Sequence, residues 1–388
     1  MEATSKINIT IGSIVEGNDF YGREKELQKA VPLILRGQSL LLSDPRRVGK
    51  SSFSMKLLEM AKEEGWKTFY FDIARIKTEE ELVKELEKDL KEVKWWNKIR
   101  DIFLDLLDGF NGSNFFALKL SINTNAFRRK YKKIKNIFES VDNTLIVIDE
   151  LGVFLKNLLE QKNGIEKTES FLLWFKEFRR VSKGKIRWIF CSSVGIEHLA
   201  SKHNLEKYLA DLTPMQIGAF SQDEAKDFIS KLDIGENAQF TKENTQYILE
   251  KLGWYLPYFI QLFVESIKSM VSDDAQITNG IIDNAYNNLL TENKMQLNFW
   301  VSRIKEYGSC KEIAHNILIF CSESKEGRSR DNLLANLLGK KTNIEEIENN
   351  LKKSLDMLKT DGYLLINDDK YTFHSHLLRD FWFNKFIK

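Results

Sequence analysis

Four short apolar runs constrain the fold of this 388-residue chain most strongly. They are residues 39–43 (SLLLS), 67–73 (KTFYFDI), 144–149 (TLIVID) and 186–192 (IRWIFCS). Runs of this kind are typical of strands that are buried on both faces of a parallel sheet. Segments with helical spacing lie between them, at residues 51–64 and 78–92. Strands that alternate with helices predict an α/β layered core.

The pattern changes after about residue 218, where strands give way to helices. Ser221 and Glu224 have the spacing of a helix-capping box. Further helices are expected at 309–322, 329–338 and 344–360, followed by a hairpin made of 362–366 and 371–373. Three helices and a hairpin in this order are typical of a winged helix. The predicted domains are therefore a core over 1–218, a helical lid over 219–306 and a winged helix over 307–388.

A phosphate-binding motif follows the first predicted strand. Residues 43–52 read SDPRRVGKSS, which matches the pattern G-x-x-x-x-G-K-S/T except that Asp44 stands at the first glycine. The backbone amides of such a loop, at the start of a helix, can bind a polyphosphate. The candidate cradle is Pro45, Arg46, Arg47, Val48, Gly49, Lys50, Ser51 and Ser52.

Each part of this loop has an expected role. Lys50 is expected to contact the outer phosphates and Ser51 to ligate Mg²⁺. We expect Asp44 to adopt a positive φ, because aspartate tolerates that region better than most residues. Its negative charge would weaken phosphate binding, and Arg46 and Arg47 are expected to offset that charge.

Two acids follow the buried strand 144–149. Asp149 is expected to help hold Mg²⁺, and Glu150 to polarise the attacking water. Ser192 and Ser193 end the next buried strand, where a hydroxyl can sense the outermost phosphate. We interpret Cys191 as a small buried apolar residue.

Taken together, six motifs resemble those of archaeal-type P-loop ATPases in the AAA+/STAND group. The motifs are DFYGREKEL (19–27), DPRRVGKSS (44–52), LIVIDEL (145–151), FCSSVGIEHL (190–199), FSQDEAKDFI (220–229) and YLPYFIQL (255–262). The C-terminal DGYLLINDDKYTFHSHLLRDFW (361–382) resembles the winged-helix end of that group. The resemblance implies ATP or ADP as the ligand, with Mg²⁺.

The resemblance also implies further site residues. Gly22, Arg23 and Glu24 would lie beside the adenine and ribose, and Pro257 would pack near the base. Pro257 also suits the first turn of a helix. His374 would contact the diphosphate, as a winged-helix histidine does in some relatives. The alternative reading of His374 and of the nearby His376 is a strand-edge or helix-start residue.

The chain departs from ring-forming relatives at two places, one of which is GWYLPYF (253–259), which lacks the sensor arginine that such relatives often carry. Residues 194–213 contain no arginine, although many such relatives place a trans-acting arginine finger there. We therefore expect a slowly hydrolysing nucleotide switch rather than a processive motor. Members of the STAND group often respond to ATP and ADP in this way, through self-assembly or a protein partner. The resemblance also allows a role in conflict systems such as antiviral defence, or in DNA transactions.

A nucleic-acid partner is the main alternative. The predicted recognition helix 344–360 carries four acids and three lysines, which opposes DNA binding. The basic stretch Arg128–Lys135 is a candidate nucleic-acid surface, although its spacing also suits the solvated side of a helix. Trp95 and Trp96 are read as core residues or as a partner surface. A DNA-binding ATPase of the replication-initiator or transposition-regulator type is thus the second hypothesis.

Composition limits the setting and the remaining function classes. The net charge is only +2, so a nucleic-acid surface would have to be local. Three cysteines without a CxxC pair argue against a disulfide framework and favour a cytoplasmic protein. We expect neither a signal peptide nor a membrane partner, because no long apolar run is present. A nucleotide-binding scaffold with a decayed site, which Asp44 suggests, is the third hypothesis.

Overall fold

The computed structural model describes residues 6–93, 96–97, 100, 141–182, 184–193, 195–235, 239–271, 276–291, 294–338 and 344–388. The chain forms two compact units. The sheet unit comprises residues 23–44 and 50–217, and the helical unit comprises 1–22, 45–49 and 218–388. Trp95 and the basic stretch Arg128–Lys135, which the sequence analysis singled out, lie outside the described residues.

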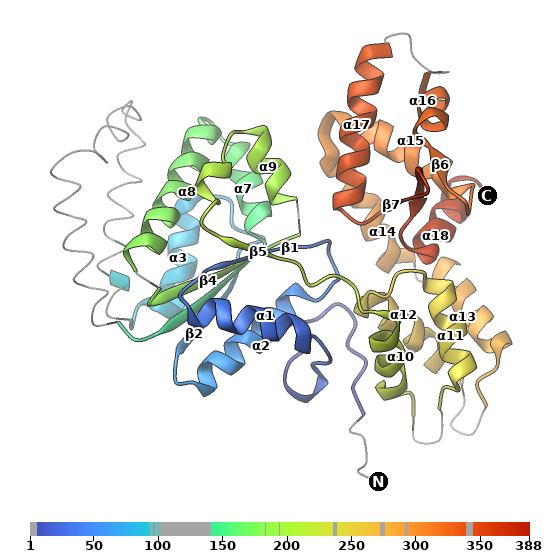
Figure 1. The fold of residues 1–388 in the computed structure, drawn as a ribbon, viewed down its shortest axis with the longest axis horizontal. Helices are drawn as coiled ribbons and strands as arrows, with labels where there is room; N and C mark the ends of the chain where they lie inside the picture. Colours follow the sequence, from blue (N-terminus) through green and yellow to red (C-terminus); the bar gives the residue numbers. More distant parts are fainter. Residues whose placement is uncertain are drawn as a thin grey trace. The chain divides into compact units, whose positions relative to one another are not determined.

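A five-stranded parallel sheet forms the centre of the sheet unit (Figure 1). Its strands are β1 (Leu40–Ser43), β2 (Lys67–Asp72), β3 (Thr144–Asp149), β4 (Ile186–Ser192) and β5 (Thr213–Met215), in the order β2-β3-β4-β1-β5. All residues of β3 and β4 are buried, as the apolar runs predict. The predicted α/β fold with a parallel sheet is therefore confirmed. The short edge strand β5 was not predicted.

Helices cover both faces of this sheet (Figure 1). They are α1 (Glu24–Leu35), α2 (Lys50–Glu63), α3 (Glu79–Leu90), α7 (Leu151–Leu159), α8 (Gly164–Val181), α9 (Ile196–Lys202) and the 3₁₀ turn Glu206–Tyr208. One face carries Phe71, Ile146, Ile148, Trp188 and Phe190, which pack in one apolar cluster with residues of α3, α7 and α8. Side chains alternate along a strand, so their neighbours in sequence point to the opposite face.

That alternation places the polar ends of the strands beside α2. Tyr70 neighbours Phe71, and Asp149 neighbours Ile148, so both lie on the face opposite the apolar cluster. The pairing register aligns Asp72 of β2 with Asp149 of β3. The carboxyl ends of parallel strands meet at one edge of the sheet, where ligand sites of this architecture form.

In the helical unit, the first helix after β5 has both hydrogen bonds of the predicted capping box. The Ser221 hydroxyl accepts a hydrogen bond from the Glu224 amide, and the Glu224 carboxylate accepts one from the Ser221 amide. The helices of this unit are α10 (Gln222–Lys231), α11 (Lys242–Leu252), α12 (Pro257–Lys268), α13 (Asn279–Thr291), α14 (Lys294–Arg303), α15 (Lys311–Ser322), α16 (Arg330–Leu338), α17 (Ile344–Thr360) and α18 (His376–Phe386), with 3₁₀ turns at Gly17–Asp19 and Ile304–Cys310. None of the described helices is long and apolar enough to cross a bilayer.

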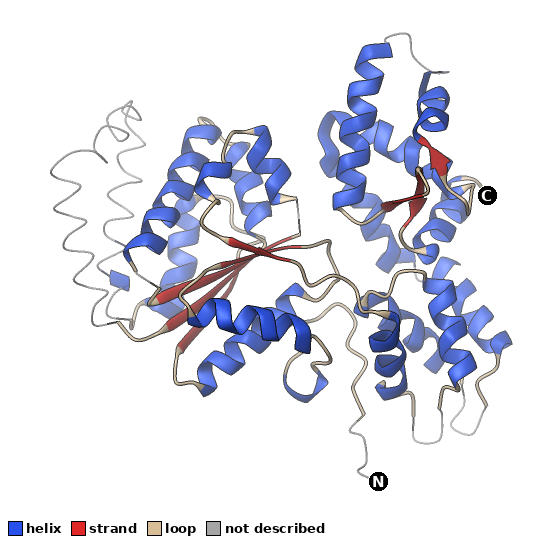
Figure 2. Ribbon diagram, viewed as in Figure 1, coloured by secondary structure: helices blue, strands red, loops and turns tan. Residues whose placement is uncertain are grey.

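A small antiparallel sheet accompanies the last helices (Figure 2). Its strands are β6 (Arg328–Ser329), β7 (Leu364–Asn367) and β8 (Lys370–Phe373), in the order β6-β8-β7. The predicted hairpin is present, and Asp368 and Asp369 form its turn with φ of 48° and 59°. A single apolar core joins residues on both sides of position 306, so a domain boundary there stays a prediction.

Candidate functional site

The loop between β1 and α2 carries the phosphate motif. Helix α2 begins at Lys50, directly after Gly49, whose φ is 100°. Space around Gly49 is open, since no atom lies within 4 Å of the position that a Cβ would occupy. The first amides of a helix have no acceptor within the helix, so they are available to an anion. The local backbone therefore has the form that the motif predicts.

Asp44 differs from the expectation drawn from the sequence. The described residues of this loop with positive φ are Arg47, at 72°, and Gly49, and Asp44 is not among them. Asp44 is 7% exposed, and its Oδ2 accepts a hydrogen bond from the Ile217 amide at 2.9 Å. The carboxylate thus has a backbone partner after β5. The expectation of a left-handed aspartate was wrong, because the loop makes its left-handed turn three residues later.

Lys50 is buried at the start of α2, with 7% of its surface exposed. Its Nζ donates to the backbone oxygen of Asp44 at 2.7 Å. Burial lowers the pKa of this ammonium, while the nearby charges of Asp44, Glu150 and Asp149 act in the opposite direction. The Lys50 ammonium would attract a phosphate, whereas the three carboxylates would repel it, so phosphate binding here would need a further cation to offset their charge.

Asp149 is held by two hydroxyl groups, as its position at the end of β3 allows. The Ser51 hydroxyl donates to Oδ2 of Asp149 at 2.5 Å, and the Tyr70 hydroxyl donates to the same oxygen at 2.7 Å. Burial, with the Asp149 charge as a second cause, raises the pKa of Tyr70 well above its usual value, so this phenol stays a donor at neutral pH. The structure therefore brings Ser51 and Asp149 together, as predicted for a metal pair. Tyr70 was missed.

Glu150 lies beside Ser193, on the neighbouring strand end. The Ser193 hydroxyl donates to Oε2 of Glu150 at 2.5 Å. Glu150 has a φ of 62°, an uncommon conformation for a residue other than glycine, and such strain concentrates at functional sites. Ser192 is fully buried, and the buried Cys191 lies 3.2 Å from the Ser54 hydroxyl. Cys191 is thus a core residue, as interpreted from the sequence.

The two loop arginines contact aromatic rings of the helical unit. The Arg47 guanidinium lies 4.4 Å from the ring centre of Tyr258, and the Arg46 guanidinium lies 4.9 Å from that of Phe299. Arg47 also donates to the Gly12 carbonyl at 3.5 Å. Lys50 is a cation whose charge interacts with that of Asp44, and an offset of the Asp44 charge by the two arginines stays a prediction.

Gly22 and Arg23 precede α1 with φ of 69° and 72°. Arg23 is 5% exposed, and its Nη1 donates to the Ile217 carbonyl at 3.0 Å. Pro257 is the first residue of α12, which confirms its predicted place in the first turn of a helix. The roles of these three residues toward a base stay predictions.

His374 packs inside the helical unit, next to the end of β8. Its ring stacks on Trp254 with centres 4.2 Å apart, and its amide donates to the Tyr363 carbonyl. His376 is the first residue of α18, and its Nδ1 is 2.8 Å from the Glu250 carbonyl oxygen. Both histidines therefore have partners within the fold, and a contact of His374 with a diphosphate stays a prediction.

The His374 environment predicts acid sensitivity. Burial lowers the pKa of His374 from 6.5 to about 4, so between these values the unfolded chain binds a proton that the folded chain does not. The free energy of unfolding therefore falls as the pH drops through this range, by about 2 kcal/mol at about pH 5. In His374→Phe, which keeps a ring against Trp254, this part of the loss should vanish. Denaturant unfolding of the wild type and His374→Phe at about pH 7.5 and pH 5 measures this difference. An equal fall in the free energy of unfolding in both proteins would contradict the prediction.

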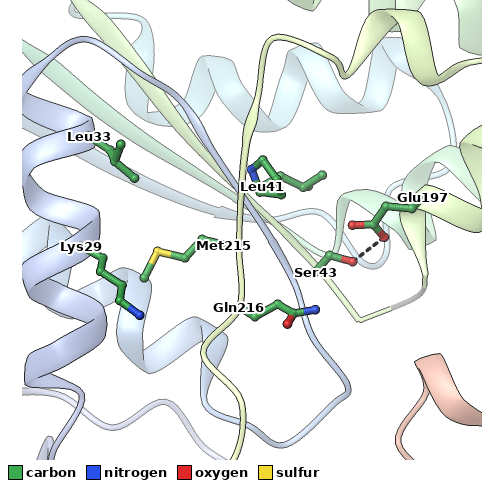
Figure 3. Close-up of a pocket in the computed structure, with 8 residues that line it drawn as sticks. Lys29, Leu33, Leu41, Ser43, Glu197, Met215 and Gln216 are labelled. Atoms are coloured by element: carbon green, nitrogen blue, oxygen red, sulfur yellow. Dashed lines mark hydrogen bonds between the residues drawn. The ribbon is translucent and has the colours of Figure 1, made fainter.

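An open pocket of about 800 Å³ lies at the β5 edge of the sheet unit (Figure 3). Its lining residues are Lys29, Leu33, Leu41, Ser43, Glu197, Pro214, Met215 and Gln216. The Ser43 hydroxyl donates to Oε2 of Glu197 at 2.7 Å. None of the predicted site residues lines this pocket, although Ser43 directly precedes Asp44 and Gln216 directly precedes Ile217.

Comparisons with known proteins show the fold class. No protein-family model matches the chain, and no curated protein matches it. The chain is similar to the solved structure of a Walker-type ATPase from Pyrococcus abyssi, with 18% identity, a TM-score of 0.64 and coverage of 96% of this chain and 99% of the other. It is also similar to the ORC2 protein of Aeropyrum pernix, solved as ADPNP-ADP complexes, with 10% identity, a TM-score of 0.53 and 98% coverage of each chain. The chain therefore has the fold of AAA+ P-loop ATPases.

Proposed function

We propose that this protein is an ATP-binding, slowly hydrolysing nucleotide switch. The observation that carries the proposal is the joining of Ser51 to Asp149 at the start of α2, with Lys50 buried beside them. A hydroxyl and a carboxylate are oxygen ligands of the kind that Mg²⁺ prefers, so these two residues fit that metal. The names of the two similar structures, a Walker-type ATPase and an ADPNP-ADP complex, support the choice of an adenine nucleotide.

In the proposed site, the backbone N–H groups of residues 46–51 and the Lys50 ammonium hold the phosphates, since Pro45 has no N–H to donate. Ser51 and Asp149 would hold Mg²⁺, which neutralises charge on the phosphates when bound. Glu150 accepts a proton from a water molecule as the water oxygen bonds to the terminal phosphorus. The bond from that phosphorus to the bridging oxygen breaks, and ADP and phosphate leave. The Ser193 hydroxyl occupies Oε2 of Glu150, so the other carboxylate oxygen would accept the proton.

The switch itself is proposed to act through a second copy of the chain or a protein partner. Residues 45–49 belong to the helical unit, whereas Lys50 and Ser51 belong to the sheet unit. The phosphate loop therefore contains two of the places at which the chain passes from one unit to the other. Particle mass and protease sensitivity, compared in ADP and in an ATP analogue, test the switch. Identical results in both nucleotides would remove the switch and leave only an ATPase.

We place DNA binding second, with the C-terminal segment interpreted as a winged helix. The order α15, β6, α16, α17, β7, β8 supports that interpretation. Charge opposes DNA, since Glu345 and Glu346 occupy the first turn of α17 and Asp368 and Asp369 form the hairpin turn. Retention of duplex DNA at low salt, with and without ATP, separates the two hypotheses.

Removing the Tyr70 hydroxyl tests the metal pair. In Tyr70→Phe, Asp149 loses one of its two recorded hydroxyl donors, and loss of such a supporting hydrogen bond weakens a metal site by about 10-fold or more. We expect the Mg²⁺ concentration for half-maximal ATP hydrolysis to rise by about 10-fold. The matched control is Tyr208→Phe. The Tyr208 hydroxyl contacts Glu169 in the same unit, so the control removes a phenol hydroxyl away from Asp149. An unchanged Mg²⁺ requirement in Tyr70→Phe would contradict the assignment.

A further inference from the structure

The chain passes between the sheet unit and the helical unit at four places: after residues 22, 44, 49 and 217. The sheet-unit residues at these places are Arg23, Asp44, Lys50 and Ile217. All four are buried, with between 4% and 7% of their surface exposed. These four residues are far apart in sequence, yet each is buried where the chain passes from one unit to the other. We call these four places the points of passage.

Hydrogen bonds join these four residues. Arg23 donates to the Ile217 carbonyl at 3.0 Å, and the Ile217 amide donates to the Asp44 carboxylate at 2.9 Å. Lys50 donates to the Asp44 carbonyl at 2.7 Å. Both backbone groups of Ile217 are thus bonded to side chains at other points of passage. The next residue, Gly218, has a φ of 67°, which favours glycine where the chain enters the helical unit.

The pairing of β1 with β5 explains why a side chain with an acceptor oxygen is useful at position 44. The ladder pairs Leu40 with Thr213 and Leu42 with Met215, where β5 ends. Two residues further on, Asp44 is level with Ile217, and the Asp44 side chain supplies the acceptor for the Ile217 amide. Glycine, which the phosphate motif has at this position, has no side chain that could do this. Asp44 therefore gives this loop a hydrogen bond to Ile217 that a glycine could not make.

We propose that Asp44 is a positioning residue that couples the phosphate loop to Ile217, and so to the segment that enters the helical unit. This inference rests on the proposed function, because it needs a phosphate on the loop. Lys50 holds the Asp44 carbonyl, and a bound phosphate competes for the same ammonium. The change at Lys50 then reaches Ile217 through the backbone and carboxylate of Asp44. The replacement of the motif's glycine by Asp44 thus links Lys50 to Ile217.

Amide hydrogen exchange resolved to single residues tests the proposal. Without nucleotide, we expect the Ile217 amide to exchange at least about 10-fold faster in Asp44→Gly and Asp44→Ala than in the wild type, because it loses its acceptor. Asp44→Asn keeps an acceptor oxygen and should keep the protection. Asp142→Gly, at the opposite end of the sheet, is the matched control. Equal Ile217 exchange in all five proteins would overturn the proposal.

The nucleotide arm tests the coupling. Exchange at Ile217 should differ between ADP and a non-hydrolysable ATP analogue in the wild type and in Asp44→Asn, and the difference should disappear in Asp44→Ala. A difference that persists in Asp44→Ala would overturn the coupling while leaving nucleotide binding intact. Calorimetry of the same samples separates the two proposals. If no nucleotide binding is detected, both the proposed function and the coupling are contradicted. The exchange rates without nucleotide would still test the hydrogen bond from Ile217 to Asp44.

Discussion

Glu150→Gln is expected to lower the rate constant of ATP hydrolysis by about 1,000-fold and to leave ATP affinity within about threefold. The amide of glutamine is similar in size to the carboxylate but cannot accept a proton. It retains an oxygen for the bond from Ser193, so the local structure should persist. Phosphate release under single-turnover conditions measures the rate, and a fluorescent ATP analogue measures the affinity.

A matched control for this variant is Glu160→Gln. Glu160 is exposed and directly follows α7, the helix that begins after Glu150. Glu160→Gln makes the same chemical change away from the site, and we expect this variant to keep the wild-type rate of ATP hydrolysis. Equal turnover in Glu150→Gln and the wild type would show that Glu150 is not the base. If neither protein released phosphate while both bound ATP, the site would be a binding scaffold, which is the third hypothesis.

Lys50→Ala is expected to weaken ATP binding by about 100-fold, since charge-assisted hydrogen bonds to a buried ammonium are among the strongest in proteins. Without nucleotide, the variant should melt within a few degrees of the wild type. Burial already lowers the pKa of Lys50, so its charge is held at a cost in the empty protein. Calorimetric titration with Mg·ATP and a thermal melt measure the two effects.

Lys62→Ala is the control for that experiment. Lys62 is exposed in the last turn of α2, the helix that Lys50 begins, and the same change there should leave affinity unchanged. A Lys50→Ala protein that binds ATP as tightly as Lys62→Ala would contradict the assigned site. A variant that no longer folds would be recognised by its melt and would not count as a loss of binding.

The buried strands could be predicted from sequence because their signal is local. Strands β3 and β4 have the predicted bounds, since every residue in each is buried and the runs end at polar residues. Strand β5 has three residues, one of them Pro214, and pairs with β1 more than 170 residues earlier. No local pattern identifies such a strand. The two-residue strand β6 was missed for the same reason.

The residues of the candidate site could be named from the sequence where a motif specifies them. Lys50, Ser51, Asp149 and Glu150 were identified from two motifs, and the parallel sheet brings the last three into hydrogen-bonded positions with Tyr70 and Ser193. Tyr70 had a usable signal: it alternates with Phe69 and Phe71 on a strand beside the one that ends in Asp149.

The bond from Ile217 to Asp44 had no such signal, because it joins a side chain to a distant backbone amide. Sequence patterns report which side chains are present, but they do not say which backbone groups are left without a partner where a short strand ends. The same limit applies to Arg23, whose partner is the carbonyl of that residue. Both contacts depend on the register of β1 with β5, which only the fold reveals.

The most direct measurement is a crystal structure grown with Mg²⁺ and a non-hydrolysable ATP analogue. We predict one triphosphate on the backbone N–H groups of residues 46–51, with Lys50 turned from the Asp44 carbonyl to the phosphates and the metal between Ser51 and Asp149. A loop without nucleotide at millimolar analogue, with Lys50 still bonded to Asp44, would contradict the account.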